Sequence, residues 1–421
     1  MARWRNWSGS VVADPARVAR PRTEAELSAL IAGADQVRMV GAGHSFTPLC
    51  ATDGALVSLA DMEGELKVAP DRASVWTPAG WTIGRLTQAL WDHGLSLANQ
   101  GDINKQAIAG ALATGTHGTG AALGSLSTQA LACRLVLADG SVVECDAERE
   151  VDFFEAQRVS LGMLGAMSRV RLSVLPAYRL KETIRRAPLD ELVEQWDDLT
   201  ARHRHVEFFV FPYAEEAMLK ILEPVEDGDD PEPKDPTGFV FQLACDLVAL
   251  APGLAAPLQR LMTKGIGAAS RAAPAYRIFP SERDILFEEM EYEIPAAGGA
   301  AALREAMAEI RRRRLPVIFP FEFRAVAGDD IWLSPMNAGP CVSISMHQYA
   351  RMDWRGAFAA IEPIFAAAGG RPHWAKRHSL NSADVLSHYP MAERWGAVRK
   401  RLDPGAKFLN SHLRELFEFS L

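Results

Sequence analysis

The sequence has 421 residues, with 45 lysines and arginines against 53 aspartates and glutamates, so its formal net charge is −8. Since one domain typically has about 150 residues, this length predicts two or three domains with cores of their own. The acidic balance disfavours binding to nucleic acid or to an anionic membrane. With 48% hydrophobic and 23% charged residues, the composition excludes wholesale disorder.

The chain has neither a spanning segment nor a disulfide framework. It contains no apolar run near the ~18 residues that a spanning helix needs, and its start has no apolar signal core. We therefore expect a soluble, cytoplasmic protein. The cysteines are odd in number, far apart and form no CxxC pair, so they predict buried free thiols rather than disulfides or a zinc site: Cys50, Cys133, Cys145, Cys245 and Cys341.

The first 175 residues alternate between short helices and strands. Thr23 and Glu26 form a capping box that predicts a helix with a buried apolar stripe. A second helix is predicted from about Ile83 to His93, with Gly94 as its stop. Strands are predicted over residues 37–40, 74–76, 131–137 and 141–145, the last two as a hairpin around Ala-Asp-Gly. This pattern indicates an α+β domain rich in tight turns.

Longer amphipathic segments follow residue 176. The acidic stretch 226–233 predicts an exposed loop. The run Arg311–Arg314 ends a helix predicted to begin near Ala300, where cations suit the negative end of the helix dipole, which favours that interpretation over a nucleic-acid patch. The apolar stretch 315–319 and residues 342–349 predict strands.

One glycine-rich segment is Val40-Gly41-Ala42-Gly43-His44-Ser45-Phe46, directly after a predicted strand. Its glycines would let backbone N–H groups turn toward an anion such as a pyrophosphate. Phe46 stands where a Rossmann fingerprint has its third glycine, and no Gly-Lys-Ser/Thr of a Walker loop is present. Taken alone, the loop is as consistent with a structural turn as with a binding site.

The second segment spans residues 100–120 and is dominated by glycine, alanine and threonine. Such a surface has almost no side chain, which suits a large flat group packed against the backbone. A bound cofactor fits this segment better than a packing defect does.

The combination of Gly-x-Gly-His-Ser with Ala-Thr-Gly-Thr-His-Gly-Thr-Gly resembles the FAD-binding domain of the vanillyl-alcohol-oxidase superfamily. Segments 290–295, 321–324, 332–335, 371–376 and 403–408 resemble the sugar-1,4-lactone oxidases and alditol oxidases, colinearly from about residue 7 to the C-terminus. The resemblance implies a two-domain α+β fold of the VAO/PCMH type. An FAD domain over 1–175 would precede a cap domain with an antiparallel sheet over 176–372, and residues 373–421 would return to the FAD domain.

The resemblance also implies FAD as the cofactor and no metal. His44 occupies the position at which the family bonds a histidine to the flavin 8α-methyl group; the alternative is a neutral histidine that only hydrogen-bonds the loop. The further contacts that the resemblance implies are Val40, Gly41, Ala42, Gly43, Ser45, Phe46, Gly101, Asp102, Ile103, Ile108, Gly110, Ala113, Thr114, Gly115, His117, Gly118, Gly165, Val170, His373 and Lys376.

The candidate catalytic residues are Glu322, Arg324 and Lys376. Glu322 and Arg324 are two apart, so on a strand both face the same side, where they could hold hydroxyl groups of a polyol. An ordinary surface ion pair is the alternative. Lys376 resembles the family lysine that approaches the flavin, and Ser345 and His347, again two apart, are expected to line the same pocket, or else to include a core histidine.

The implied reaction moves hydride from a hydroxyl-bearing carbon of a sugar lactone or polyol to flavin N5. Either Glu322 or Lys376 takes the hydroxyl proton, and Lys376 needs a lowered pKa to do so. Gly101 stands where a small residue is associated with oxygen access, which favours an oxidase that makes hydrogen peroxide. Asp102 departs from the Ser of many relatives and is a candidate substrate contact. An alditol oxidase, a dehydrogenase with another acceptor and a non-oxidase flavoprotein remain alternatives, and a monomer or weak homodimer is expected.

Overall fold

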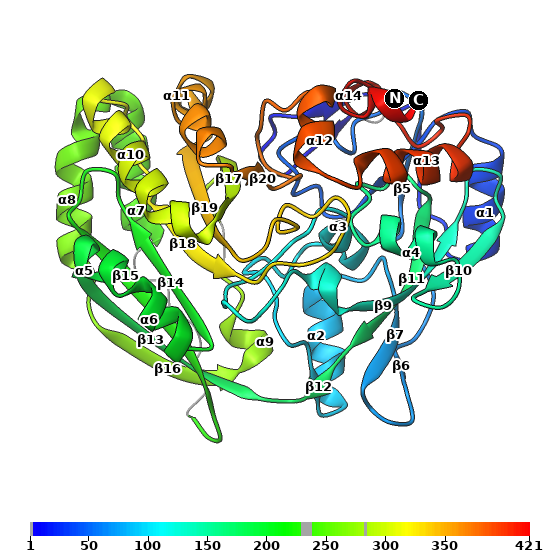
Figure 1. The fold of residues 1–421 in the computed structure, drawn as a ribbon, viewed down its shortest axis with the longest axis horizontal. Coiled ribbons are helices and arrows are strands. Elements are labelled where there is room, and N and C mark those ends of the chain that lie inside the picture. The colour runs from blue at the N-terminus through cyan, green and yellow to red at the C-terminus, as the bar shows by residue number, and fades with distance from the viewer. Residues whose placement is uncertain (1–2, 229–237, 282–283) are drawn as a thin grey trace.

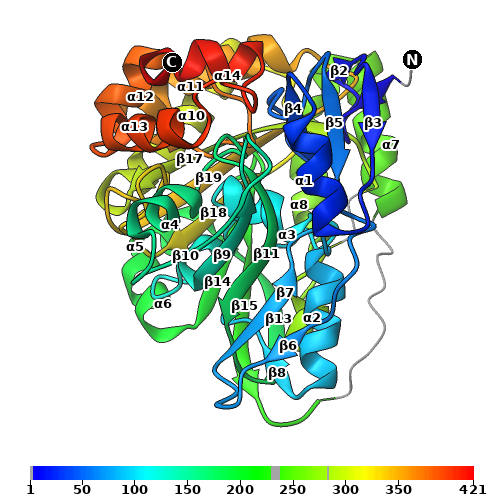
Figure 2. The same ribbon diagram turned by 90° about the vertical axis from the view of Figure 1, so that its right-hand side faces the viewer.

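The computed structural model describes residues 3–228, 238–281 and 284–421. Within these residues the strands form sheets of eight, five and three strands and two two-stranded ribbons. In Figures 1 and 2 the eight-stranded sheet and its helices form one half of the molecule, and the smaller sheets form the other half, beside both chain termini. This mixture of helices with mostly antiparallel strands confirms the predicted α+β class.

The first half contains two sheets and the helices that cover them. Its parallel sheet has the order β3 (Arg17–Ala19), β5 (Ala55–Ser58), β4 (Val37–Val40). Its antiparallel sheet has the order β10 (Val142–Asp146), β9 (Ala130–Val136), β11 (Ala166–Ser173), β7 (Ser74–Pro78), β6 (Lys67–Val68). The ribbons are β1 (Trp4–Arg5) with β2 (Val12–Ala13) and β8 (Leu95–Ser96) with β12 (Leu175–Pro176). The helices are α1 (Glu24–Ala32), α2 (Ile83–Asp92), α3 (Ile108–Ala113), α4 (Val151–Gln157) and the 3-10 turn Leu126–Gln129.

The predicted helix starts and the hairpin are confirmed. Thr23 Oγ1 accepts a hydrogen bond from the Glu26 amide at 3.2 Å, while the Glu26 carboxylate reaches back to the Arg22 amide at 2.7 Å. α2 ends at Asp92, and Gly94 follows with a φ of +68°, the left-handed conformation that favours glycine after a helix. β9 and β10 pair antiparallel around the Ala-Asp-Gly turn.

The eight-stranded sheet, called here the large sheet, forms the centre of the second half. Its order is β16 (Ala269–Pro274), β13 (Arg179–Pro188), β15 (Glu216–Val225), β14 (His205–Val210), β18 (Phe321–Val326), β19 (Cys341–Tyr349), β17 (Phe287–Pro295), β20 (Arg371–Pro372). The surrounding helices are α5 (Leu189–Glu194), α6 (Trp196–Arg202), α7 (Gly238–Leu250), α8 (Ala255–Gly265), α9 (Ala275–Ile278), α10 (Ala296–Arg313), α11 (Trp354–Ala367) and the 3-10 turn Pro252–Leu254.

The two faces of the large sheet differ in chemistry because successive side chains of a strand alternate between them. One face packs against α5, α6, α10 and α11 and carries apolar residues from β17, β18 and β19: Met290, Tyr292, Ile294, Phe321, Phe323, Val342, Ile344 and Met346. The opposite face carries the residues in between, which are polar although they are buried. This polar face supplies the candidate active site.

The expected strand over 315–319 is wrong, because this segment is buried but irregular. Its carbonyl oxygens accept hydrogen bonds from side chains rather than from a neighbouring strand; Tyr213 Oη donates to Leu315 O at 2.9 Å, and the Gln259 side chain donates to Val317 O. Pro316 lacks the backbone N–H that a ladder needs. An apolar run alone could not reveal this difference.

The C-terminal segment runs from β20 back across the first half. The Phe46 amide donates to Ala375 O at 2.7 Å, and the Val37 amide donates to Lys407 O at 2.9 Å. The helices α12 (Ser382–His388), α13 (Ala392–Leu402) and α14 (Ser411–Leu416), with the 3-10 turn Glu418–Ser420, share one apolar cluster with α4. In Figure 1 they lie above the smaller sheets. Residues 374–376 are therefore fixed against the loop that follows β4.

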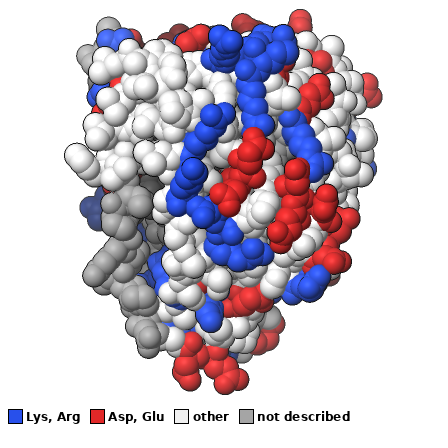
Figure 3. Space-filling view, turned by 90° about the vertical axis from the view of Figure 1, so that its left-hand side faces the viewer, with Lys and Arg blue, Asp and Glu red and all other residues white. Residues whose placement is uncertain are grey.

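The arginine run 311–314 lies at the end of a helix, as the sequence predicts. α10 ends at Arg313 with Arg311–Arg313 in its last turn, as predicted, although it begins at Ala296, four residues before the expected start. Figure 3 shows basic and acidic side chains interleaved on the outer side of the half that contains the large sheet. Of the acidic stretch 226–233, residues 229–233 lie outside the described residues. Among the described helices, none is both long and apolar enough to cross a bilayer.

Candidate active site

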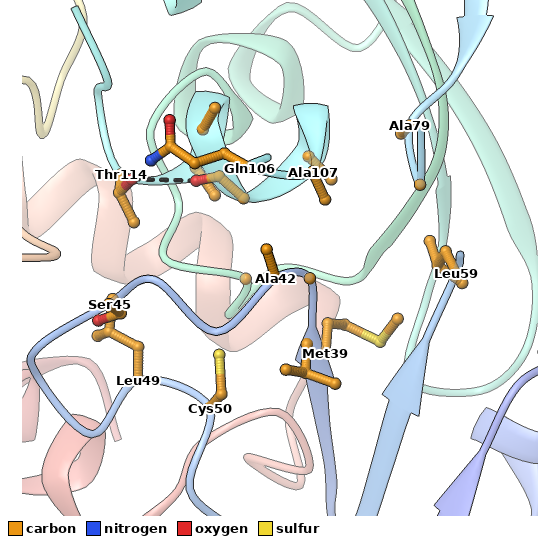
Figure 4. A pocket seen from close by; sticks show the side chains of 18 of the residues that line it. Met39, Ala42, Ser45, Leu49, Cys50, Leu59, Ala79, Gln106, Ala107 and Thr114 are labelled. Atoms are coloured by element: carbon orange, nitrogen blue, oxygen red, sulfur yellow. Dashed lines mark hydrogen bonds between the residues drawn. The ribbon is translucent and has the colours of Figure 1, made fainter. Parts of the chain in front are cut away.

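An elongated cavity lies in the first half, between the loop after β4 and helix α3. Figure 4 shows Ala42 and Ser45 on one side of it and Gln106 and Ala107 on the other. Ten of the predicted cofactor contacts line this cavity: Val40, Gly41, Ala42, Gly43, His44, Ser45, Gly110, Ala113, Thr114 and Gly165. We call it the cofactor cavity.

The walls of the cofactor cavity suit a large anionic group. Nearly half of its lining residues are glycine or alanine, so much of the wall is backbone. A side chain at Gly41 would place its Cβ only 2.7 Å from Ala107 Cβ, which would close the space between the two walls. The described lining residues include two cations, Arg38 and Lys105. They include no aspartate or glutamate. Backbone walls with nearby cations fit the pyrophosphate and flat rings of FAD.

His44 lines the cofactor cavity with its imidazole stacked on Trp7, at 5.4 Å between ring centroids and 28° between planes. Burial lowers the pKa of His44 to about 4, and the charges of Lys376 and Lys105 act in the same direction. The ring is therefore neutral at physiological pH, and one ring nitrogen has a free lone pair. That is the protonation state that a nucleophilic imidazole requires.

A second, smaller cavity lies between the polar face of the large sheet and the loop 101–106, and we call it the substrate cavity. Nine predicted residues line it: Gly101, Asp102, Ile103, His117, Glu322, Arg324, His347, His373 and Lys376. Lys376 comes from the segment after β20. Glu322 and Arg324 come from β18, where their spacing of two places them on one face of the strand, as predicted. Ser345 is not among the lining residues. It accepts a hydrogen bond from Arg324 Nη2 at 2.9 Å.

The cations of the substrate cavity are held by carboxylates of β17. Arg324 Nη2 lies 2.8 Å from Glu291 Oε1 and 3.7 Å from Glu322 Oε2. Lys376 Nζ donates to Glu289 and lies 3.8 Å from Glu291 Oε2. Because Arg324 and Glu322 are 7% and 4% exposed, the alternative of an ordinary surface ion pair is wrong.

These ion pairs fix the charge of Lys376. Burial opposes its charged form, but Glu289 and Glu291 outweigh burial and raise the pKa of Lys376. Burial likewise opposes the charge of Glu289, yet Lys376 and His347 lower the pKa of this carboxyl to about 2. Lys376 is therefore an ammonium ion at neutral pH. A lysine that acts as a base would need a lowered pKa, whereas the pKa of Lys376 is raised.

Three site residues were missed in the sequence: Glu289, Glu291 and Glu293. They alternate along β17 with Met290, Tyr292 and Ile294, which belong to the apolar core. A strand with glutamates at every second position and core residues between them has one polar and one apolar face. That period of two was visible in the sequence and could have identified the three glutamates.

Five other predicted contacts, all among the described residues, lie in packed positions away from the lining of both cavities. Ile108 and Val170 belong to the apolar core around α2 and β11, and Phe46 packs against Trp7 and Phe287. Gly115 has a φ of +76°, and Gly118 lies against the carbonyl oxygen of Gln100. Their expected contacts with the cofactor stay predictions.

Sequence comparison places the chain among flavin-dependent proteins. Residues 15–146 match the FAD-binding domain family, and residues 170–416 match the D-arabinono-1,4-lactone oxidase family. The chain is 38% identical to the L-gulono-1,4-lactone dehydrogenase of Mycobacterium tuberculosis, with 98% of each chain covered. It is 29% identical to the L-gulonolactone oxidase of Bos taurus, covering 99% of this chain and 98% of the relative. It is also 29% identical to the alditol oxidase of a Streptomyces species, with 98% of each chain covered.

Among solved structures, the cholesterol oxidase from B. sterolicum superposes with a TM-score of 0.84 at 17% identity, covering 99% of this chain and 96% of the other. At this identity the likeness shows the fold alone, and it confirms the predicted VAO/PCMH-type architecture. The family match extends over more than half of the chain and includes the strands that carry Glu322, Arg324 and the β17 glutamates. The chain therefore belongs to the D-arabinono-1,4-lactone oxidase family.

Proposed function

We propose that the protein is an FAD-dependent oxidase of a sugar-1,4-lactone, with an alditol as the alternative substrate. The observation that carries this proposal is the substrate cavity, where Glu322, Arg324 and Lys376 share one lining; Gln106 lines both this cavity and the cofactor cavity. Bound FAD supplies the acceptor for hydride. The names of the relatives, which include lactone and alditol oxidases, support the same chemistry.

The proposed roles of the protein's own side chains follow from their charges. Lys376 and Arg324, both cations, hold the reacting hydroxyl and a neighbouring oxygen by charge-assisted hydrogen bonds. Because Lys376 already carries its proton, we assign Glu322 as the base that takes the hydroxyl proton. Asp102 and His347 complete the lining and offer hydrogen bonds to further hydroxyl groups.

Substrate class is tested by anaerobic bleaching of the flavin. L-gulono-, L-galactono- and D-arabinono-1,4-lactone, xylitol, sorbitol and glycerol are added to the oxygen-free holoprotein, and air is then admitted. Lactones are expected to bleach the flavin faster than the alditols do. If no compound of the panel bleaches it, the proposed function fails; if only alditols do, the alternative substrate holds.

Oxygen is the proposed electron acceptor because Gly101, which has no side chain, lines the substrate cavity and would leave room there for oxygen. A Cβ at this position would lie 3.1 Å from His117 O and 3.3 Å from Thr116 Cγ2, so an alanine would fill the gap tightly. One relative is named L-gulono-1,4-lactone dehydrogenase, so an electron acceptor other than oxygen is the second candidate.

Gly101→Ala is expected to slow reoxidation of the reduced flavin by oxygen about ten-fold, a barrier change of roughly 1.4 kcal/mol. Stopped-flow mixing of the reduced protein with oxygen measures this rate. Anaerobic reduction by the substrate serves as the internal control and should stay close to wild type. Equal reoxidation rates in the two proteins would show that Gly101 does not govern oxygen access.

His44 is proposed to bind FAD covalently, supported by its neutral ring and its place in the cofactor cavity. After acid precipitation, the yellow chromophore of the wild-type protein is expected to stay with the pellet. In His44→Ala it should appear in the supernatant, since no other bond retains it. Release of the chromophore from the wild-type protein would contradict the bond and leave His44 as a hydrogen-bonding group.

We further propose the domain boundaries given by the sequence, with an FAD domain over 1–175, a substrate domain over 176–372 and a returning segment over 373–421. The separate sheets and the contacts of residues 374–376 with the loop after β4 support them. The protein is proposed to act as a monomer or weak homodimer.

A further inference from the structure

The ring of His117 is surrounded by hydrogen-bond acceptors. Its Nδ1 lies 2.9 Å from the carbonyl oxygen of Gly118, and its Nε2 lies 2.8 Å from Glu291 Oε1 and 3.1 Å from Glu293 Oε1. A carbonyl oxygen can only accept, so Nδ1 carries a hydrogen. Nε2 meets two carboxyl groups, and these contacts need at least one more proton on the ring or on a carboxyl.

The two carboxyl groups at Nε2 have opposite surroundings. Glu291 Oε1 also accepts from Arg324 Nη2 at 2.8 Å and from Ser343 Oγ at 2.7 Å. Such a set of donors stabilises an anion. Burial opposes that charge, but Arg324 and His117 outweigh it and hold the pKa of Glu291 well below its usual range.

Glu293 lacks such support. Its side chain is 0% exposed, and among the described residues its Oε2 has no hydrogen-bond partner. An ionised carboxylate with a bare, buried oxygen is costly, whereas a neutral acid is much less so. Burial and the nearby charge of Glu291 both raise the pKa of Glu293.

We propose that at neutral pH His117 and Glu293 hold two protons besides the one on Nδ1, so that His117 is an imidazolium and Glu293 an uncharged acid, and that they position Glu291 against Arg324. Glu293 is thus a positioning residue, since it acts through His117. The protonation states are inferred independently of the proposed function. Only their role rests on it, which is to prepare the substrate cavity for a substrate hydroxyl oxygen that loses its proton.

The charge count explains that purpose. With His117 and Arg324 positive, Glu291 negative and Glu293 neutral, the charges of these four groups sum to +1; Lys376 pairs with Glu289, and Glu322, 3.7 Å from Arg324, is the proposed base. An ionised Glu293 would bring this sum to zero and weaken the stabilisation that Arg324 and Lys376 give to the negative charge developing on the substrate oxygen. A preformed positive potential at that point is a common source of catalytic stabilisation.

Other groups face the pair from the neighbouring elements. They are Arg324 on β18, Cys341 and Ser343 on β19, His373 after β20, and Tyr389 between α12 and α13. The rings of His117 and His373 lie 6.0 Å apart, and the pKa of His373 is lowered to about 3 by burial, so it stays neutral. Among the described groups, Arg324 and Glu291 therefore dominate the electrostatics of the pair.

The ligand atoms of His117, Glu291 and Glu293 all lie within 4.8 Å of one another, a spacing that a metal ion could also bridge. Metal binding would have to remove the proton from Nε2 and compete with Arg324 and Ser343 for the same Glu291 oxygen. Protons satisfy these contacts without displacing any donor, which favours them over a metal.

The test follows His117 in holoprotein labelled with ¹⁵N-histidine, and the His117 signal is identified by its loss in His117→Gln. Burial opposes the charge of His117, but its hydrogen bonds to Glu291 and Glu293 raise its pKa to about 9. An imidazolium spectrum is therefore expected to persist at pH 8 in the wild-type protein. Its absence there, or one equivalent of tightly bound metal, would overturn the proposal.

The variant Glu293→Gln then tests whether Glu293 is a neutral acid or an ionised carboxylate. If Glu293 is uncharged while His117 titrates, the equally uncharged glutamine should leave the His117 midpoint at or above its wild-type value. If Glu293 were ionised throughout, removing its charge would move the transition to lower pH. A lowered His117 midpoint therefore overturns the proposal, and an unchanged or raised one supports it.

Glu288→Gln is the matched control, because this buried neighbour on β17 pairs with Arg377, away from His117. It should leave the His117 transition in place. The wild-type spectrum needs neither variant to fold and no turnover. Its outcome is therefore independent of whether the protein oxidises a lactone.

Discussion

Lys376→Met is expected to slow reduction of the flavin by substrate about 10²-fold or more, while FAD content stays unchanged. Methionine has nearly the length of lysine but no charge, so the variant removes the ammonium group that faces the reacting oxygen. Lys376 lines the substrate cavity, while the cofactor cavity is lined by Ala375 and the loop 40–45. Anaerobic stopped-flow reduction measures the rate, and the absorbance ratio of flavin to protein measures the FAD content.

Two variants make this result specific. Lys376→Arg keeps a cation near Glu289 and should recover part of the rate. Arg377→Met removes the adjacent charge, which pairs with Glu288 at 2.8 Å and does not line the cavity, so the folded variant should reduce its flavin at close to the wild-type rate. A Lys376→Met protein that reduces its flavin at the normal rate would remove Lys376 from the mechanism.

Local patterns in the sequence were sufficient for much of the site. The loop after β4 and the residues around α3 were recognisable because glycine and alanine expose backbone, and both segments do line the cofactor cavity. The spacing of Glu322 and Arg324 placed them on one face of a strand, and β18 has that geometry. In each case, the information lies within a few consecutive residues.

The missed features depend on pairing between distant segments. Whether the glutamates of β17 meet a cavity or solvent is decided by the pairing of β17 with β19 and β20, whose paired residues lie at least 46 positions away in sequence. The raised pKa of Lys376 likewise needs Glu289, 87 positions earlier. Sequence spacing therefore left the choice between Glu322 and Lys376 as base open, and three-dimensional pairing favours Glu322.

The polar face of the large sheet is stable because nearly every charge on it has a partner of opposite sign. β17 contributes the anions, and β18, the His117 loop and the segment after β20 contribute the cations. Most of these side chains are under 9% exposed, so a lost partner is not replaced fully by water. Substitutions in the network should thus affect folding as well as catalysis.

Arg324→Met is expected to lower the free energy of unfolding by about 3–5 kcal/mol, because it leaves Glu291 and Glu322 buried without their shared cation. Urea unfolding of the purified holoprotein and variant measures the change. The variant should also bind substrate poorly, since Arg324 lines the substrate cavity. Arg304→Met is the matched control: its pair with Asp190, at 2.8 Å, is 47% and 80% exposed, so its loss should cost under about 1 kcal/mol.

The double variant Arg324→Met/Glu291→Gln identifies the origin of the cost. If the loss in Arg324→Met comes from the unpaired carboxylate, neutralising Glu291 should restore part of the stability without restoring substrate binding. If it came only from lost packing of the arginine stem, the second substitution would add a further loss, because Ser343 and His117 would exchange a charged acceptor for a neutral one. Recovery of stability with binding still absent therefore assigns Arg324 both roles, neutralising the β17 carboxylates and holding the substrate.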